Sequence, residues 1–292
     1  MHQLTLINVD DIQTVVNVAS VPQRSPFRYP GGKTWLIPQV KRWLFSMGTK
    51  PRLLVEPFAG GGIVGLTAAF EELVERVVLV ERDEQVASVW RAILGGDADW
   101  LANRIMNFEM CHETLETELG KGGGPIREMA FRTLLRNRTN HGGIMAPGAG
   151  LIKYGENGKG ISSRWYPRTL AKRIREIGRI RSKIEFIQGD GLDVIREHAC
   201  ESETAFFIDP PYTAAGKKAG RRLYTYNEID HEGLFTLTES VRGKFLMTYD
   251  DAKGVRDMAA RHGFFVETVA MSNTHHTKMQ ELLISKDLAW VR

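Results

Sequence analysis

Cysteine is scarce in this sequence, which has only Cys111 and Cys200 among its 292 residues. The two lie far apart and neither belongs to a Cys-x-x-Cys pair, which argues against a disulfide framework and against a structural zinc site. No apolar run approaches the length of a membrane span, and the first residues lack a basic segment followed by an apolar one. We therefore expect a reduced, cytoplasmic protein that contacts no membrane and binds no metal.

Basic residues are concentrated in one segment, although the formal net charge is only +4. Between residues 121 and 183 there are 15 Lys or Arg and three acidic residues, whereas the rest of the chain has more acidic than basic residues. A local basic excess is typical of a surface that binds nucleic-acid phosphates. The length suits one large domain, or one domain with an insertion.

The most informative stretch ends in the tetrapeptide Asp209-Pro210-Pro211-Tyr212. The apolar run before it predicts a buried strand, and two consecutive prolines prevent that strand from continuing. Asp209 and the carbonyl of Pro210 could accept the two hydrogens of an amino group, while Tyr212 stacks on a flat ring. The alternative, a tight turn with Tyr212 as a packing residue, is less favoured because the tetrapeptide rarely occurs by chance.

A glycine-rich turn follows the first predicted strand, residues 52–56. Phe58, Gly60 and Gly62 lie in this turn, where glycines let a nucleotide-like cofactor approach the backbone. Upstream, Tyr29 and Lys33 flank a Gly-Gly pair and could bind a small anionic ligand. The spacing Gly60-x-Gly62-x-x-Gly65 also fits a dinucleotide fingerprint, so a nicotinamide oxidoreductase is an alternative.

Acidic residues end two further predicted strands, and they are candidates for ligand binding. Glu81 ends the strand 77–81 and could accept hydrogen bonds from ribose hydroxyls, with Asp83 as a lesser candidate. Asp190 follows the strand 184–188, at the end of the strand where open α/β sheets bind ligands. Four more strands are expected at residues 205–208, 244–248, 264–269 and 281–285.

The basic segment combines a predicted helix over residues 126–138 with a long glycine-rich loop that follows it. Basic, amide and aromatic side chains in such a loop suit phosphate contacts, hydrogen bonds to base edges and stacking. The candidate DNA-binding residues are Arg136, Arg138, Asn140, Lys153, Lys159 and Arg164.

Several motifs occur together and in order: Phe27 to Lys33, Glu56 to Gly62, the strand ending in Glu81, and Asp209 to Tyr212. Over about residues 27–285 this combination resembles the Dam-type class of DNA adenine-N6 methyltransferases. The stretch Arg138-Thr139-Asn140-His141-Gly142 and the segment 271–284 look similar as well. Tyr29 stands where close relatives often have Trp, and either ring can stack.

The resemblance implies an α/β fold: a seven-stranded, mostly parallel sheet flanked by helices, with an inserted and mainly helical DNA-recognition domain. It places an N-terminal extension at 1–26, a catalytic domain that binds S-adenosylmethionine at 27–120 and 184–292, and the insertion at 121–183. The expected partner is double-stranded DNA, with a cognate restriction nuclease as a further possibility. Asp209, Pro210 and Tyr212 are the expected catalytic residues. The expected cofactor-binding residues are Tyr29, Lys33, Glu56, Phe58, Gly60, Gly62, Glu81, Asp190 and Asp209.

The expected reaction is methyl transfer to the exocyclic amine of an adenine that has left the duplex. Positioning and electrostatics would carry the catalysis, without a covalent enzyme intermediate. A cytosine-N4 methyltransferase would use nearly the same chemistry and stays an alternative. An RNA or protein amino-group methyltransferase and a non-catalytic DNA-binding module are less favoured.

Overall fold

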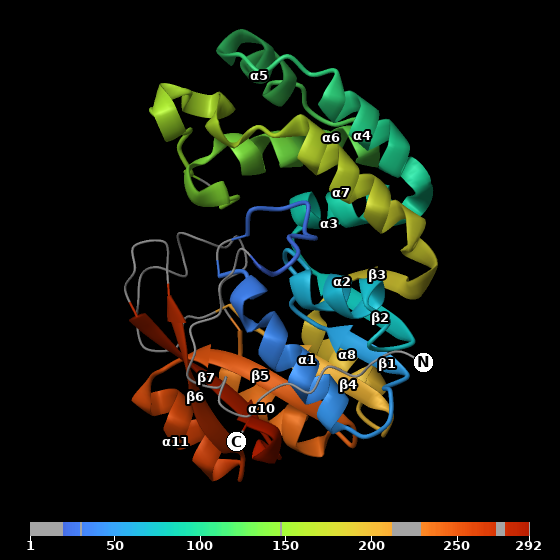
Figure 1. Ribbon diagram of the computed structural model, residues 1–292, viewed down its shortest axis with the longest axis vertical. Helices are drawn as coiled ribbons and strands as arrows, with labels where there is room; N and C mark the ends of the chain where they lie inside the picture. Colours follow the sequence, from blue (N-terminus) through green and yellow to red (C-terminus); the bar gives the residue numbers. More distant parts are fainter. Residues whose placement is uncertain (1–19, 30, 147, 212–228, 273–277, 292) are drawn as a thin grey trace.

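The computed structural model describes residues 20–29, 31–146, 148–211, 229–272 and 278–291. These residues form one seven-stranded sheet with helices on both faces, and a layer of helices lies beyond one end of it (Figure 1). Each strand coincides with one predicted from the sequence. The strands are β1 (Leu53–Glu56), β2 (Arg76–Glu81), β3 (Ile184–Gln188), β4 (Thr204–Ile208), β5 (Lys244–Asp250), β6 (Phe265–Ser272) and β7 (Lys278–Ser285).

The strand order is β3-β2-β1-β4-β5-β7-β6, which confirms the expected α/β class with a seven-stranded, mostly parallel sheet. Strands β1 to β5 are parallel, and β7 runs antiparallel between β5 and β6. The chain order reverses between β1 and β4, where the carboxyl ends of parallel strands leave a crevice. Because β7 is antiparallel, its first half lies beside the end of β5, and Asp250 pairs with Glu281.

The sheet is buried on both faces, which explains its nearly continuous apolar strands. On β4, Phe207 and Phe206 point to opposite faces, and both are fully buried. One face is covered by α1 (Ile37–Ser46), α2 (Ile63–Phe70) and α3 (Glu84–Ala92). The other is covered by α8 (Gly191–His198), α10 (His231–Ser240) and α11 (Lys253–Arg261).

The helical layer contains α4 (Ala98–Met106), α5 (His112–Leu119), α6 (Ile126–Thr139) and α7 (Pro167–Arg179) (Figure 1). Helix α6 packs on α3, and α7 packs on α4 so closely that a Cβ added to Gly178 would lie 2.7 Å from the Cβ of Ala98. The layer thus begins at α4, and the predicted insertion boundary at residue 121 falls between two of its helices, α5 and α6. The apolar stripe of α4 gave no sign that it covers a helix rather than the sheet. No helix in the described ranges is both long and apolar enough to cross a membrane.

Residues 20–26, predicted as part of an N-terminal extension, are integrated into the fold. Arg24 forms a 3.1 Å ion pair with Glu71, and Ser25 Oγ donates a 2.6 Å hydrogen bond to the Gly61 carbonyl. The Pro26 carbonyl accepts a 2.5 Å hydrogen bond from Arg138 in the helical layer. The segment therefore connects the glycine turn with the helices above it.

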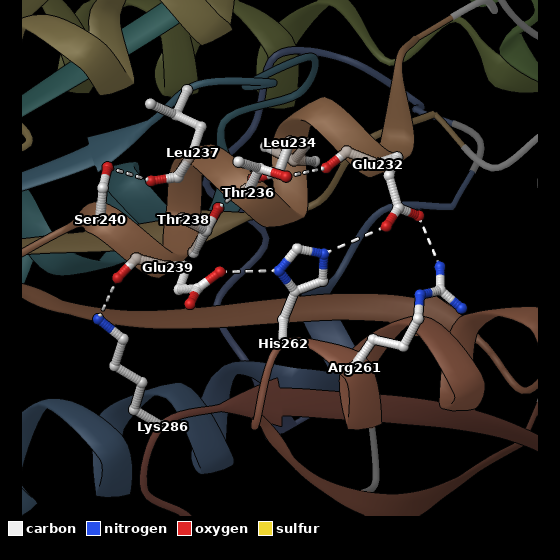
Figure 2. A network of polar contacts seen from close by, with 10 residues as sticks. All are labelled: Glu232, Leu234, Thr236, Leu237, Thr238, Glu239, Ser240, Arg261, His262 and Lys286. Carbon is white, nitrogen blue, oxygen red and sulfur yellow. Dashed lines mark hydrogen bonds and ion pairs between the residues drawn. The ribbon is translucent and has the colours of Figure 1, made fainter.

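A network of polar contacts joins α10 to α11 (Figure 2). The His262 ring lies between two carboxylates of α10, with Nδ1 3.0 Å from Glu239 and Nε2 3.3 Å from Glu232. Arg261 donates a 2.7 Å hydrogen bond to Glu232, and Lys286 donates one of 2.8 Å to the Glu239 carbonyl. These contacts fix the helices that cover this face of the sheet.

Candidate active site

A cavity of about 730 Å³ opens at the carboxyl ends of the central strands, within the size range of small-molecule sites. The structure brings the predicted cofactor-binding residues together on its wall, although they come from five separate stretches of the chain. Tyr212 lies outside the described residues. The predicted residues that line the cavity are Tyr29, Lys33, Glu56, Phe58, Gly60, Gly62, Glu81, Asp190, Asp209 and Pro210.

The glycine turn is shaped by residues with left-handed backbone conformation, Gly60 at φ 46° and Gly62 at φ 60°. Trp90, buried in α3, donates a 3.0 Å hydrogen bond from Nε1 to the Gly60 carbonyl and so stabilises the conformation of the turn. A Cβ added to Gly60 would lie 2.5 Å from the Tyr29 ring. Only glycine lets the aromatic ring lie this close to the turn.

Glu81 is held by the backbone on both of its oxygens. Oε2 accepts a 3.1 Å hydrogen bond from the Gly60 N–H, and Oε1 accepts one of 2.8 Å from Asp83. Burial raises the pKa of Glu81 to about 7. A carboxylate has about four acceptor positions, so hydroxyl groups in the cavity could still bind to it.

Asp83 and Asp190, the other two acids predicted to bind ligand, each cap the N-terminus of a helix. Asp83, the lesser ribose candidate, caps α3 by accepting hydrogen bonds from Gln85 and Val86. Asp190 caps α8 through a 2.9 Å hydrogen bond from the Leu192 N–H, and it still lines the cavity.

Glu56 ends β1 and is 4% exposed. Its Oε2 accepts a 2.7 Å hydrogen bond from the Gly65 N–H in the first turn of α2. Burial raises the pKa of Glu56 to about 8, and the nearby charge of Asp209 acts in the same direction. Glu56 is therefore largely protonated at neutral pH and adds little charge to the cavity.

Asp209 is held by two donors, Lys33 and Thr248, and Lys33 in turn contacts Glu281. Lys33 Nζ lies 2.9 Å from Asp209 Oδ1 and 3.0 Å from Glu281 Oε1. Thr248 Oγ1 donates a 2.7 Å hydrogen bond to the same Oδ1. Burial opposes the charge of Lys33, yet the carboxylates of Asp209 and Glu281 together raise its pKa above the ordinary value.

Sequence reasoning missed Thr248 and Glu281. An acid inside the apolar strand β7 was a usable signal for Glu281, because a buried carboxylate needs a cation or hydrogen-bond donors nearby. The pairing of strands β4, β5 and β7 brings both residues to Asp209, and sequence patterns do not show that pairing. Nothing in the sequence distinguishes Thr248 from any other strand threonine.

Comparisons with known proteins bear on the family that the chain resembles. Residues 29–119 match the family model for the D12 class N6 adenine-specific DNA methyltransferase. A curated DNA N-6-adenine-methyltransferase from Escherichia phage P1 is 26% identical over 269 residues, which is 86% of this chain. The Dam-type resemblance is confirmed. The chain spans about a third of that phage protein, 33% of its length.

Solved structures show a more distant likeness. The rRNA methyltransferase aviRa from Streptomyces viridochromogenes is 14% identical, and the match covers 98% of this chain and 94% of that one with a TM-score of 0.41. A likeness at this level carries no argument about the substrate of this chain.

Three of the predicted DNA-binding residues are held by contacts within the protein. Arg138 is 6% exposed and donates its hydrogen bond to Pro26, and burial lowers its pKa to about 9. Asn140 is buried and donates a 2.8 Å hydrogen bond to the Ile144 carbonyl, while Arg136 donates one of 2.9 Å to Gln85. Arg138 and Asn140 are too deeply buried here to contact DNA phosphates directly. Sequence shows that a side chain is basic but not which way it points.

The other three predicted DNA-binding residues lie on the glycine-rich segment between α6 and α7. Lys153 and Lys159 are exposed, and Arg164 forms a 2.5 Å ion pair with Glu156. Two arginines that were not predicted, Arg28 and Arg173, line the cavity beneath this segment. Arg28 and Arg173 therefore add basic groups to a cavity that also contains Glu81, Asp190 and Asp209.

Proposed function

We propose that this protein is a DNA adenine-N6 methyltransferase that uses S-adenosylmethionine. The observation that carries the proposal is the position of Asp209, which precedes Pro210 and lies on one cavity with Glu81 and the glycine turn. The match of residues 29–119 to the D12 class and the name of the phage relative support adenine N6 as the acceptor.

The residues of the cavity suit this cofactor. Glu81 offers acceptors for ribose hydroxyls, the glycine turn offers close backbone approach, and Tyr29 and Phe58 offer rings for packing. S-adenosylmethionine supplies an electrophilic methyl group on a positively charged sulfur. The carboxylates of Glu81 and Asp209 give this side of the cavity the negative charge that complements such a cation.

Asp209 and Pro210 would position the acceptor. The exocyclic amine of adenine is a poor nucleophile, because its lone pair is delocalised into the ring. Hydrogen bonds from its N–H groups to the Asp209 carboxylate and the Pro210 carbonyl keep that lone pair directed at the methyl group. The base must leave the duplex to reach this position, and we propose that Tyr212 stacks on it.

The helical layer and the glycine-rich segment would hold the DNA. Lys153 and Lys159 are exposed and can contact phosphates, whereas Arg138 and Asn140 brace the segment from inside. We therefore propose that the recognition part extends from α4 to α7 rather than over residues 121–183 alone. A cognate restriction nuclease and a cytoplasmic location stay predictions.

Product analysis tests the proposal. The protein is incubated with duplex DNA and methyl-labelled S-adenosylmethionine, and the digested nucleosides are identified by mass spectrometry. N6-methyladenine is expected, whereas N4-methylcytosine would favour the alternative acceptor and the absence of label would contradict the proposal. RNA serves as competitor. Asp209→Ala should abolish turnover and keep DNA binding, while Glu185→Gln, on the exposed edge strand β3, is the matched control.

A further inference from the structure

Glu281 has an unusual setting for a carboxylate. It is 4% exposed and comes from the antiparallel strand β7, whose following residues Leu282 and Leu283 are fully buried. Burial of a charged carboxylate is unfavourable unless a partner compensates for its lost hydration. Its Oε1 lies 3.0 Å from Lys33 Nζ, so Lys33 is one partner.

Lys33 connects Glu281 to the reacting end of the cavity. Its ammonium group is 2.9 Å from Asp209 Oδ1, and it donates a 3.0 Å hydrogen bond to the Gly31 carbonyl. The side chain itself is 4% exposed. An ammonium held between two carboxylates and a carbonyl has a defined position, which a flexible lysine otherwise lacks.

Thr248 is a second donor to Asp209, and it contacts the same oxygen as Lys33. Thr248 Oγ1 lies 2.7 Å from Oδ1, so a hydroxyl from β5 and an ammonium from the loop after Tyr29 converge on one oxygen. Two donors on one oxygen fix the rotation of the carboxylate, and the direction of the other oxygen follows from it. An acceptor for an amino group needs this defined orientation.

From this geometry we propose that Glu281 is a positioning residue, which acts through Lys33 to orient the Asp209 carboxylate for the amino group of the target base. The inference rests on the proposed function. It also changes the role expected for Lys33, which becomes a support of Asp209 rather than a direct contact of the cofactor. With Glu281 neutral, the ammonium loses the Glu281 carboxylate as a charged partner, so the position of Lys33 and the orientation of the Asp209 carboxylate are less well defined.

The test compares Glu281→Gln, which keeps the shape and removes the charge, with wild type and with the control Glu185→Gln. We expect kcat to fall ten- to a hundredfold in Glu281→Gln, while KM for S-adenosylmethionine and the affinity for S-adenosylhomocysteine change less than twofold. Thermal melting verifies folding. An unchanged kcat, or a weakened cofactor affinity with normal kcat, would overturn the proposal.

A double-mutant cycle with Lys33→Met tests whether Glu281 acts through the lysine. If it does, Glu281→Gln has little further effect on kcat once Lys33 is absent, and additive losses would refute the connection. Crystal structures give a readout that does not depend on activity: in Glu281→Gln, Lys33 Nζ or the Asp209 carboxylate should move from its wild-type position. An unmoved pair would count against the proposal even if wild type methylates no adenine, so the two hypotheses can fail separately.

Discussion

The pKa of Glu81 predicts a pH dependence of cofactor binding. Without ligand this pKa is about 7, because burial disfavours the charged carboxylate. Ribose hydroxyls that donate to the carboxylate favour its charged form, so binding and deprotonation support each other. Roughly a tenth of the ligand-free protein has ionised Glu81 at pH 6, half at pH 7 and nine tenths at pH 8. We expect the affinity for S-adenosylhomocysteine to fall about tenfold between pH 8 and pH 6.

Isothermal titration calorimetry over pH 5.5–9 measures this dependence directly. Glu81→Gln keeps the shape of the side chain but cannot ionise, so its affinity should be nearly independent of pH between 6 and 8. It should also bind about five- to thirtyfold more weakly than wild type at pH 8, since hydrogen bonds to a charged acceptor are stronger by about 1–2 kcal/mol.

Two results would contradict the assignment of this pH dependence to Glu81. One is an unchanged pH dependence in Glu81→Gln, which would assign the titration to another group. The other is a midpoint near 8 that disappears in Glu56→Gln, because the pKa of Glu56 is about 8 and this residue also lines the cavity.

Three further changes should act on stability. The folded-state pKa of Glu56, about 8, lies above the unfolded value. The contribution of Glu56 to the free energy of unfolding is therefore fully present below about pH 4.5 and is lost as the pH rises through 8. Glu56→Gln should melt at a higher temperature than wild type at pH 9 but not at pH 5. Trp90→Phe leaves the Gly60 carbonyl without its donor and should lower the free energy of unfolding by about 2–4 kcal/mol in urea titrations. Gly191→Ala would place a Cβ 2.2 Å from the Pro57 carbonyl oxygen and should cost at least as much, with cofactor affinity lost too; a melting temperature equal to wild type would contradict the close packing.

Much of the fold could be predicted from the sequence because the sheet is covered on both sides. A strand such as β4, which is buried along its whole length, must be apolar throughout, and the prolines after Ile208 mark its end. The glycine turn was equally visible, since close approach of the Tyr29 ring requires glycine at position 60.

The features that could not be predicted from the sequence depend on how distant parts of the chain pack together. Glu281 reaches Lys33 because an antiparallel strand lies beside β5, and that register has no local pattern. Likewise, the helical spacing of Arg136 and Arg138 was clear, but only the packing of α6 on α3 shows that Arg138 points inward. The start of the helical layer at Ala98 could not be predicted either, because it depends on the packing of α4 on α7.

A crystal structure with S-adenosylhomocysteine and a DNA duplex tests most directly whether Asp209 binds the target amine. We predict the ribose hydroxyls at Glu81 and an extrahelical adenine whose N6 lies within about 3.2 Å of Asp209. A ligand bound outside this cavity, or an adenine that stays stacked in the duplex with Asp209 distant from any nucleobase, would rule out the proposed role of Asp209.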